Sequence, residues 1–159
     1  IMESMKMKSE NSYSKFFIML TLSFMAMYVT MYLNTYALDH VYFSMTRFYM
    51  ACLGISVMGV IMLLMMKGMY TERKKNLAIL IGSVILFGLA LSLVRMQRPV
   101  IGDVLYMKGM IPHHSIAILT SERADIKDPE VRKLAGEIIA AQKKEIEEMK
   151  KMINRLENE

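Results

Sequence analysis

Two methionines and two adjacent histidines lie close together in MKGMIPHHSIAIL, residues 107–119. On a helix, Met107, Met110 and His114 would stand at positions i, i+3 and i+7 along one face, with His113 flanking that face. Thioether sulfur and imidazole nitrogen together suit Cu(I), whereas Mg²⁺ and Ca²⁺ need oxygen ligands such as carboxylates, which this segment lacks. The residue types and their spacing are therefore compatible with a soft-metal site.

The same residues are also compatible with ordinary helix packing. The chain has 19 methionines in 159 residues, so two of them at helical spacing are expected in any core. Two imidazoles on a mostly apolar face are costly to bury without partners, however, and this favours ligation. From spacing alone, packing and metal binding remain equally open.

Three long apolar segments indicate a membrane protein. The chain is 54% hydrophobic, and each segment contains a run without charged residues that is long enough, as a helix, to cross about 30 Å of hydrocarbon. A signal peptide is an alternative for the first segment, but its apolar run is longer than a typical signal core. We predict a membrane domain over residues 1–98, with transmembrane helices at about 16–38, 45–66 and 77–95.

Positive charges predict the orientation of these helices in the lipid bilayer. Three lysines precede the first span and four cations separate the second span from the third, whereas residues 34–42 between the first two spans have none. Cations favour the cytoplasmic side, so we expect the N-terminus inside and the C-terminus outside, although Arg95 and Arg98 act against this. The excess of Lys and Arg over Asp and Glu that gives the net charge of +5 lies in residues 1–100, where it can contact anionic lipid headgroups. No nucleic-acid partner is indicated.

Several other side chains are expected to have ordinary roles. The single cysteine, Cys52, lies within the second span and is most simply a buried structural thiol. The methionines of the spans are most simply apolar filler, because no intramembrane acid or base accompanies them. His40, beside Asp39 in the first connection, is expected to be a solvated loop histidine.

A helical hairpin is predicted after the third span. Asp103 is a good N-cap for a helix that starts at Val104, and Asp-Pro-Glu at residues 128–130 is a strong start signal for a second helix. Apolar residues recur at three- and four-residue spacing from there to the end of the chain. The turn between the helices is too short for anything but antiparallel neighbours, so residues 103–157 form a hairpin domain.

The hairpin geometry brings donors of the second helix near the first. A compact turn puts position 107 opposite about 146, so Met149 would lie within a turn of Met107, with Met152 one turn farther on. Both could complete a thioether shell or line a second site. Two polar residues lie on or near the apolar seam, and one of them is expected to hydrogen-bond an imidazole: Gln142 and Glu145.

A lone hairpin of this size buries little apolar surface and needs a partner. Two hairpins from two copies of the chain would form a four-helix bundle, with further contact between the membrane helices, so a homo-oligomer is expected. Packing against the protein's own loops, or against a different protein, is the competing arrangement.

The motif MKGMIPHHSIAI, preceded by Asp103 and followed by KLAGEIIAAQKKEIEEMKKMI at residues 133–153, resembles the domain of unknown function 305 family. The characterised members of that family include the CopM-like copper-binding proteins of the bacterial periplasm. The resemblance covers about residues 103–156 and implies a ferritin-like helical bundle. The family often has another methionine after the histidine pair, where this chain has Leu119-Thr120. Many relatives are longer and soluble, with more than one hairpin, which strengthens the expectation of an oligomer here.

The resemblance implies a copper site, with Cu(I) the expected ion. Together with the three predicted spans and their orientation, it leads us to expect a protein of the bacterial inner membrane whose hairpin lies in the periplasm and buffers, sequesters or transfers copper. A structural accessory subunit of a larger membrane complex is the alternative, and no enzyme is predicted, because neither an activated nucleophile nor paired carboxylates are found. The implied ligands are Met107, Met110, His113, His114, Met149 and Met152, supported by Gln142, Glu145 and Asp103.

Overall fold

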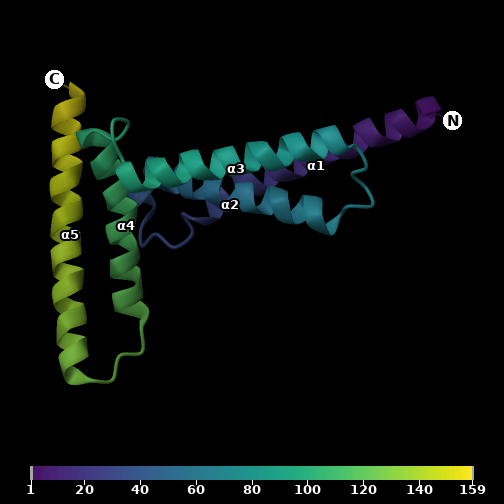
Figure 1. Ribbon diagram of the computed structural model, residues 1–159. Helices are drawn as coiled ribbons and strands as arrows, with labels where there is room; N and C mark the ends of the chain where they lie inside the picture. The colour runs from purple at the N-terminus through teal and green to yellow at the C-terminus, as the bar shows by residue number, and fades with distance from the viewer. Residues whose placement is uncertain (1, 159) are drawn as a thin grey trace. The chain divides into compact units, whose positions relative to one another are not determined.

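The computed structural model describes residues 2–158 and the side chains of residues 11–158, and this part of the chain is helical and contains no strand. A short 3₁₀ helix, η1 (Leu38–His40), lies in the connection between the first two α-helices. The predicted all-α class is therefore confirmed. The α-helices are α1 (Met2–Thr30), α2 (Met45–Met65), α3 (Arg73–Met96), α4 (Asp103–Arg123) and α5 (Pro129–Asn158) (Figure 1).

The chain folds into two compact units. The first contains the residues up to Val29 together with Phe48–Gln97, and so holds most of α1 to α3. The second contains Thr30–Arg47 together with the chain from Arg98 onward. The connection between α1 and α2, which the sequence division at residue 98 placed with the membrane helices, thus belongs to the same unit as α4 and α5.

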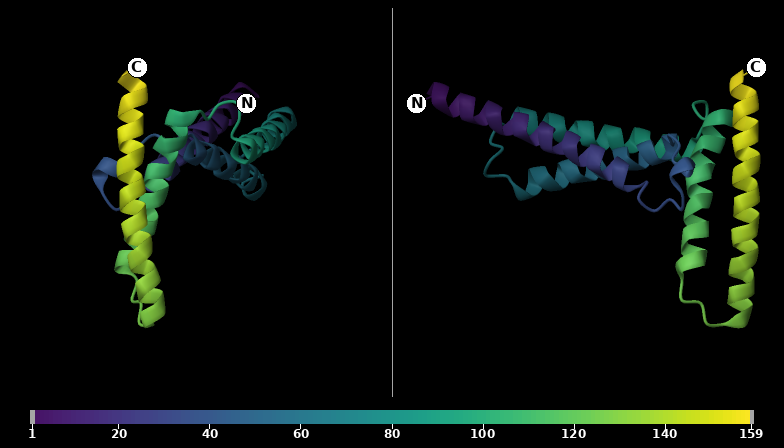
Figure 2. Two further views of the ribbon diagram at one scale, coloured as in Figure 1. Left: turned by 90° about the vertical axis from the view of Figure 1, so that its left-hand side faces the viewer. Right: turned by 180° about the vertical axis from the view of Figure 1, so that it is seen from behind.

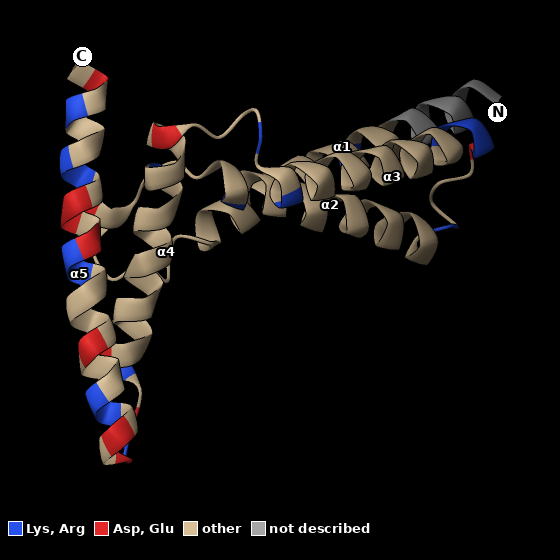
Figure 3. Cartoon of the chain, turned by 60° about the vertical axis from the view of Figure 1, so that its left-hand side comes forward, with Lys and Arg blue, Asp and Glu red and all other residues tan. Residues whose placement is uncertain are grey.

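Three helices of the first unit are long and apolar enough to cross a membrane, namely α1 over Asn11–Thr30, α2 and α3. Many of their large apolar side chains are exposed, and Figure 3 shows few charged residues along them. Exposed apolar surface of this extent is unfavourable in water and is typical of lipid-facing helices. The expectation of three membrane-crossing helices agrees with this structure.

Aromatic side chains form the core of the first unit near the connection between α2 and α3. The rings of Tyr13 and Phe16 pack on Tyr70, with centroids 5.3 and 5.2 Å away. The Tyr13 hydroxyl donates to Oδ1 of Asn76 (2.6 Å) and accepts from the backbone N–H of Glu72 (3.2 Å). These contacts fasten α1 to the beginning of α3.

The first helix ends earlier than the apolar pattern predicts, at Thr30 instead of near residue 38. Arg47 accounts for this end, because its guanidinium donates to the carbonyl of Met31 and lies over the ring of Tyr32, 4.3 Å from the ring centroid. A carbonyl that would otherwise need a helical partner is satisfied in this way. The chain is then free to leave the helix and pack against α4 and α5.

The two helices of the second unit lie side by side and run in opposite directions, as Figures 1 and 2 show. At the start of α5, Oδ1 of Asp128 accepts from the backbone N–H groups of Glu130 (2.9 Å) and Val131 (3.0 Å), so the predicted N-cap is confirmed. At the start of α4 the N-cap is Gly102, and Asp103 is instead the first helical residue. The predicted cap at Asp103 is therefore wrong by one position.

The register between α4 and α5 also differs from the one expected for a compact turn. That register would place His114 opposite about residue 139, whereas His114 faces Glu145, and Lys108 pairs with Glu157. The cause is the linker, because Ala124 is extended (φ −68°, ψ 139°) and the chain does not turn back at once. The first residues of α5 consequently run past the end of α4.

Candidate metal site

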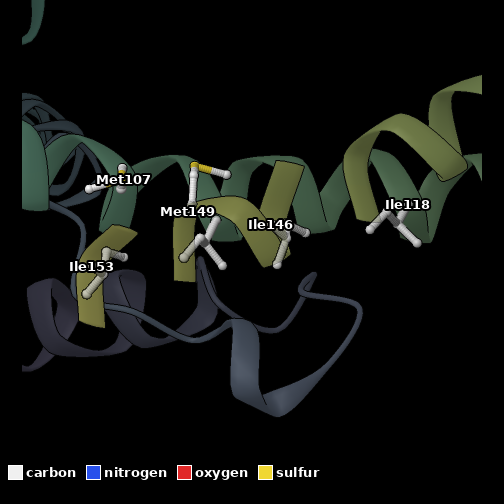
Figure 4. Packing of buried hydrophobic residues seen from close by; sticks show 6 residues of the cluster. Met107, Ile118, Ile146, Met149 and Ile153 are labelled. Carbon is white, nitrogen blue, oxygen red and sulfur yellow. The ribbon is translucent and has the colours of Figure 1, made fainter. Parts of the chain in front are cut away.

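Two of the predicted thioether donors lie in the buried core between α4 and α5. Met107 is 6% exposed and Met149 is 7% exposed, and Figure 4 shows both among the side chains packed between the two helices. Met110 is half-buried and packs against this cluster. The structure therefore brings together three of the four predicted methionines. The remaining members of the buried cluster are Ile111, Ile118, Ile146 and Ile153.

His114 lies beside a carboxylate of the opposite helix. Its Nδ1 is shielded from solvent and lies 3.0 Å from Oε2 of Glu145, although the contact lacks the alignment of a hydrogen bond. The same carboxylate oxygen accepts from Nε2 of Gln142 (3.3 Å). The two polar residues that the sequence placed near the seam thus lie next to each other, and one of them is next to an imidazole.

The surroundings of His114 favour its neutral form. Burial lowers the pKa of this imidazole, the Glu145 carboxylate opposes that effect, and the neighbouring His113 adds to it. The neutral ring is the form that binds metal ions. A ring nitrogen that is buried without a hydrogen bond is also unusual and costly, so His114 is the least well satisfied polar group of this region.

The other predicted site residues lie outside the buried cluster. His113 is exposed, and its ring centroid is 6.0 Å from that of His114. Met152 is 40% exposed. Asp103 is exposed in the first turn of α4, and no hydrogen bond joins it to the cluster within the described residues. The predicted set therefore divides into buried and exposed donors.

His40 was expected to be solvated, and that expectation is wrong. The residue is only 9% exposed, and its Nδ1 lies 3.0 Å from Oγ of Ser115 on α4. The same hydroxyl oxygen accepts from the backbone N–H of Tyr36 (2.7 Å). Ser115 was the sequence signal for this contact. It lies on the apolar face of α4, and a buried hydroxyl group there requires hydrogen-bond partners.

The donors that come together fit a soft ion better than a hard one. Thioethers and a neutral imidazole are ligands for Cu(I), whereas zinc and di-iron sites are built from His, Cys, Asp and Glu. Over the described residues, no group of three or more such side chains lies close enough to hold a metal ion. The soft donors that the buried core of the α4–α5 pair brings together are methionine sulfurs.

Comparison with known proteins agrees with the sequence motif. Residues 103–159 match the family described as Domain of unknown function (DUF305). An uncharacterized protein of Acanthamoeba polyphaga mimivirus is 35% identical over an alignment of 144 residues that covers 89% of this chain and 92% of the viral protein, so the similarity extends into the membrane helices. No solved structure matches. Through its α4–α5 pair, the chain belongs to the DUF305 family.

Proposed function

We propose that this protein is a membrane-anchored copper-binding protein that buffers, sequesters or transfers Cu(I) at its α4–α5 pair. The observation that carries the proposal is the gathering of Met107, Met110 and Met149 in and beside one buried cluster, with the shielded imidazole of His114 on the same helix as two of them. These ligand types favour Cu(I) over hard ions. The resemblance to copper-binding members of the DUF305 family supports the same assignment.

The three methionines, His114, Glu145 and Gln142 each have a role in this proposal. The three methionines would supply sulfur, and His114 would bind through Nε2, because its Nδ1 faces Glu145. A carboxylate beside the second ring nitrogen orients a ligating imidazole and increases its basicity. Gln142 would hold that carboxylate in place. Bound Cu(I) would be a cargo that is taken up and released, so no catalytic step is assigned.

The membrane helices would serve as the anchor of the site. The distribution of lysine and arginine supports an orientation in which α4 and α5 lie on the side opposite the N-terminus. In a bacterium this side would be the periplasm. Because the similar viral protein comes from a mimivirus, the proposal names no particular membrane.

A Cu(I) titration of the full-length protein in detergent tests the proposed function. The protein competes with a chromogenic Cu(I) chelator under reducing conditions, and we expect wild type to withdraw copper from the chelator. His114→Ala should bind at least about tenfold more weakly, because it removes the shielded imidazole that the proposal assigns as a copper ligand. Far-UV circular dichroism establishes that the variant keeps its helices.

His40→Gln is the matched control, since it removes a buried imidazole of the same unit that lies against Ser115 instead of the methionines. It should retain wild-type copper affinity. A wild-type protein that cannot compete for Cu(I) at all would overturn the proposal. Stoichiometric co-purification with unrelated membrane subunits, in that case, would support an accessory role in a larger complex.

A further inference from the structure

A groove lies between α1 and α3 in the first unit, and Ile55 and Ser56 of α2 also line it. Its volume of about 380 Å³ is in the range of pockets that hold small molecules. The lining residues of α1 and of α3 recur at three-, four- and seven-residue spacing, so one side of each helix faces the groove. We call it the α1–α3 groove and define it by Tyr13, Phe17 and Leu20 of α1 and by Lys75, Gly82 and Leu86 of α3.

The length of the α1–α3 groove matches one leaflet of a lipid bilayer. Lys75 and Leu86, at its two ends, are eleven residues apart on α3, which corresponds to about 16 Å along a helix. The hydrocarbon core of a bilayer is about 30 Å thick. Because α3 begins at Arg73, Lys75 lies in its first turn, at the level of the lipid headgroups. The groove therefore reaches from that level to about the middle of the membrane.

The α1–α3 groove is apolar along its length and charged at one end. Among the described residues that line it, Lys75 is the only charged one. Phe17 is 55% exposed, and a Cβ added to Gly82 would meet no atom within 4 Å. The groove thus has room for an apolar chain and a cation where a headgroup would lie.

Lys75 is held at the end of the groove by neighbouring side chains. Its Nζ lies 3.0 Å from Oε1 of Glu72 and 5.0 Å from the ring centroid of Tyr13. The Tyr13 hydroxyl is fixed in turn by Asn76 and by the backbone of Glu72, as described above. An ammonium group has three N–H donors, and the Lys75 side chain is 41% exposed. It can therefore donate to a phosphate oxygen while it keeps its contact with Glu72.

We propose that the α1–α3 groove binds an acyl chain of an anionic phospholipid and that the phosphate of this lipid contacts Lys75. The inference does not depend on the copper function, because the groove lies in the first unit and the proposed copper site in the second. Charge selects the occupant. Residues 67–75 carry four cations and one acid, and Figure 3 shows basic residues at this end of α3. Basic residues at the ends of membrane helices attract anionic headgroups.

A helix of a second copy matches the charged end of the groove less well. A copy with the same orientation in the membrane would bring its own cations of residues 67–75 to the same level, and like charges repel. A phospholipid instead brings a phosphate to that level. Its chain also extends only through one leaflet, as the groove does.

Fluorescence quenching tests the site, because the chain has no tryptophan. Phe17→Trp places one indole in the groove, and Leu80→Trp is the matched control. Leu80 is exposed and does not line the groove. The two positions have similar depth, because each lies four residues beyond one partner of the hydrogen bond between Tyr13 and Asn76. Each full-length variant is placed in phosphatidylcholine vesicles that contain the same minor fraction of either phosphatidylglycerol or phosphatidylcholine with brominated chains.

Brominated phosphatidylglycerol should associate with the indole of Phe17→Trp about fivefold more strongly than brominated phosphatidylcholine, the effect expected of one lysine near an anionic headgroup. Leu80→Trp should be quenched nearly equally by the two lipids. Equal quenching of Phe17→Trp by both lipids would overturn the proposal. The same preference at both positions would also overturn it, because it would indicate a general attraction around the helices.

Filling the groove tests the site without a change of charge. Gly82→Leu, made in the Phe17→Trp background, adds a side chain where there is open space, so it should remove the preference for phosphatidylglycerol. Gly88→Leu is the matched control, since a Cβ at Gly88 also meets open space and Gly88 does not line the groove. It should keep the preference. An unchanged preference in Gly82→Leu would contradict binding in the groove.

Two lysine variants test the headgroup contact in the same background. Lys75→Gln should remove the preference for phosphatidylglycerol. Lys74→Gln removes the same charge from an exposed residue that does not line the groove, and it should keep most of the preference. Far-UV circular dichroism establishes that each variant keeps its helices. Equal losses in the two variants would overturn the contact between the phosphate and Lys75.

Discussion

The contact between His114 and Glu145 yields a prediction for a single residue. Replacement of Glu145 by Gln removes the carboxylate that lies 3.0 Å from Nδ1, and we expect Cu(I) affinity to fall by about 10–100-fold, as for other partners of metal-binding histidines. In the metal-free protein the pKa of His114 should fall further, because the carboxylate opposes the effect of burial. Competition titration and an NMR pH titration of the imidazole measure the two effects.

Glu148→Gln is the matched control for this prediction. Glu148 is exposed, and its carboxylate lies 3.9 Å from Nζ of Lys144 on the same helix. An exposed pair of this kind contributes little, so the variant should bind copper like wild type. Equal losses in Glu145→Gln and Glu148→Gln would mean that the overall charge of α5 matters and the contact with His114 does not.

At the residue scale, the sequence could identify donors but not their exposure. The spacing of Met107, Met110 and His114 along one side of a helix follows from the period of 3.6 residues. The register between α4 and α5 decides which donors are buried. That register depends on the extended backbone at Ala124, and the sequence gives no clear signal for this conformation. The contact between His40 and Ser115 joins residues 75 positions apart and cannot be inferred from local pattern.

At the scale of elements, the docking of the α1–α2 connection on α4 is expected to weaken at acidic pH. Burial lowers the pKa of His40 from its ordinary value of 6.5, with the nearby Asp39 and Glu147 carboxylates opposing and Lys150 adding to this effect. Well above pH 6.5 the His40 ring is neutral in both the folded and the unfolded chain, so its titration does not change the free energy of unfolding. Below that pH only the unfolded chain gains the proton readily, and the folded state loses stability until the lower pKa of the folded protein is passed.

Thermal unfolding of the metal-free protein in detergent measures this effect. Wild type should lose more stability than His40→Gln between pH 7.5 and pH 5. An unchanged pH dependence in His40→Gln would show that the buried ring does not govern the docking.

Among the elements, those with local signals could be predicted and those set by distant contacts could not. The start of α5 was predictable because Asp128 supplies its side-chain oxygen to the N–H groups of the next turn. The end of α1 was not, because it depends on Arg47, which lies beyond the connection. The α1–α2 connection consists of mixed polar and aromatic residues, and this pattern does not indicate that the connection packs on α4 and α5.

At the scale of the whole molecule, the membrane class could be predicted with ease. The apolar length of α2 and α3 alone satisfies the requirement for spanning the hydrocarbon layer. Because the α1–α2 connection belongs to the same compact unit as α4 and α5, the connection and these two helices must lie on the same side of the membrane. A protein with three spans meets this condition, since the segment after the first span and the segment after the third span emerge on one side.

Cysteine labelling tests that topology together with its direction. In a Cys52→Ser background produced in bacterial cells, Lys127→Cys places a thiol in the exposed turn between α4 and α5, and Lys67→Cys places one in the exposed turn between α2 and α3. If the cations near Lys67 hold that turn in the cytoplasm, a membrane-impermeant maleimide should label Lys127→Cys in intact cells and Lys67→Cys only after lysis. Each variant is the control for the other, since both thiols replace solvent-exposed lysines. The reverse pattern would place α4 and α5 in the cytoplasm, where the proposed copper site would meet the intracellular thiol pool, and would require the orientation to be abandoned.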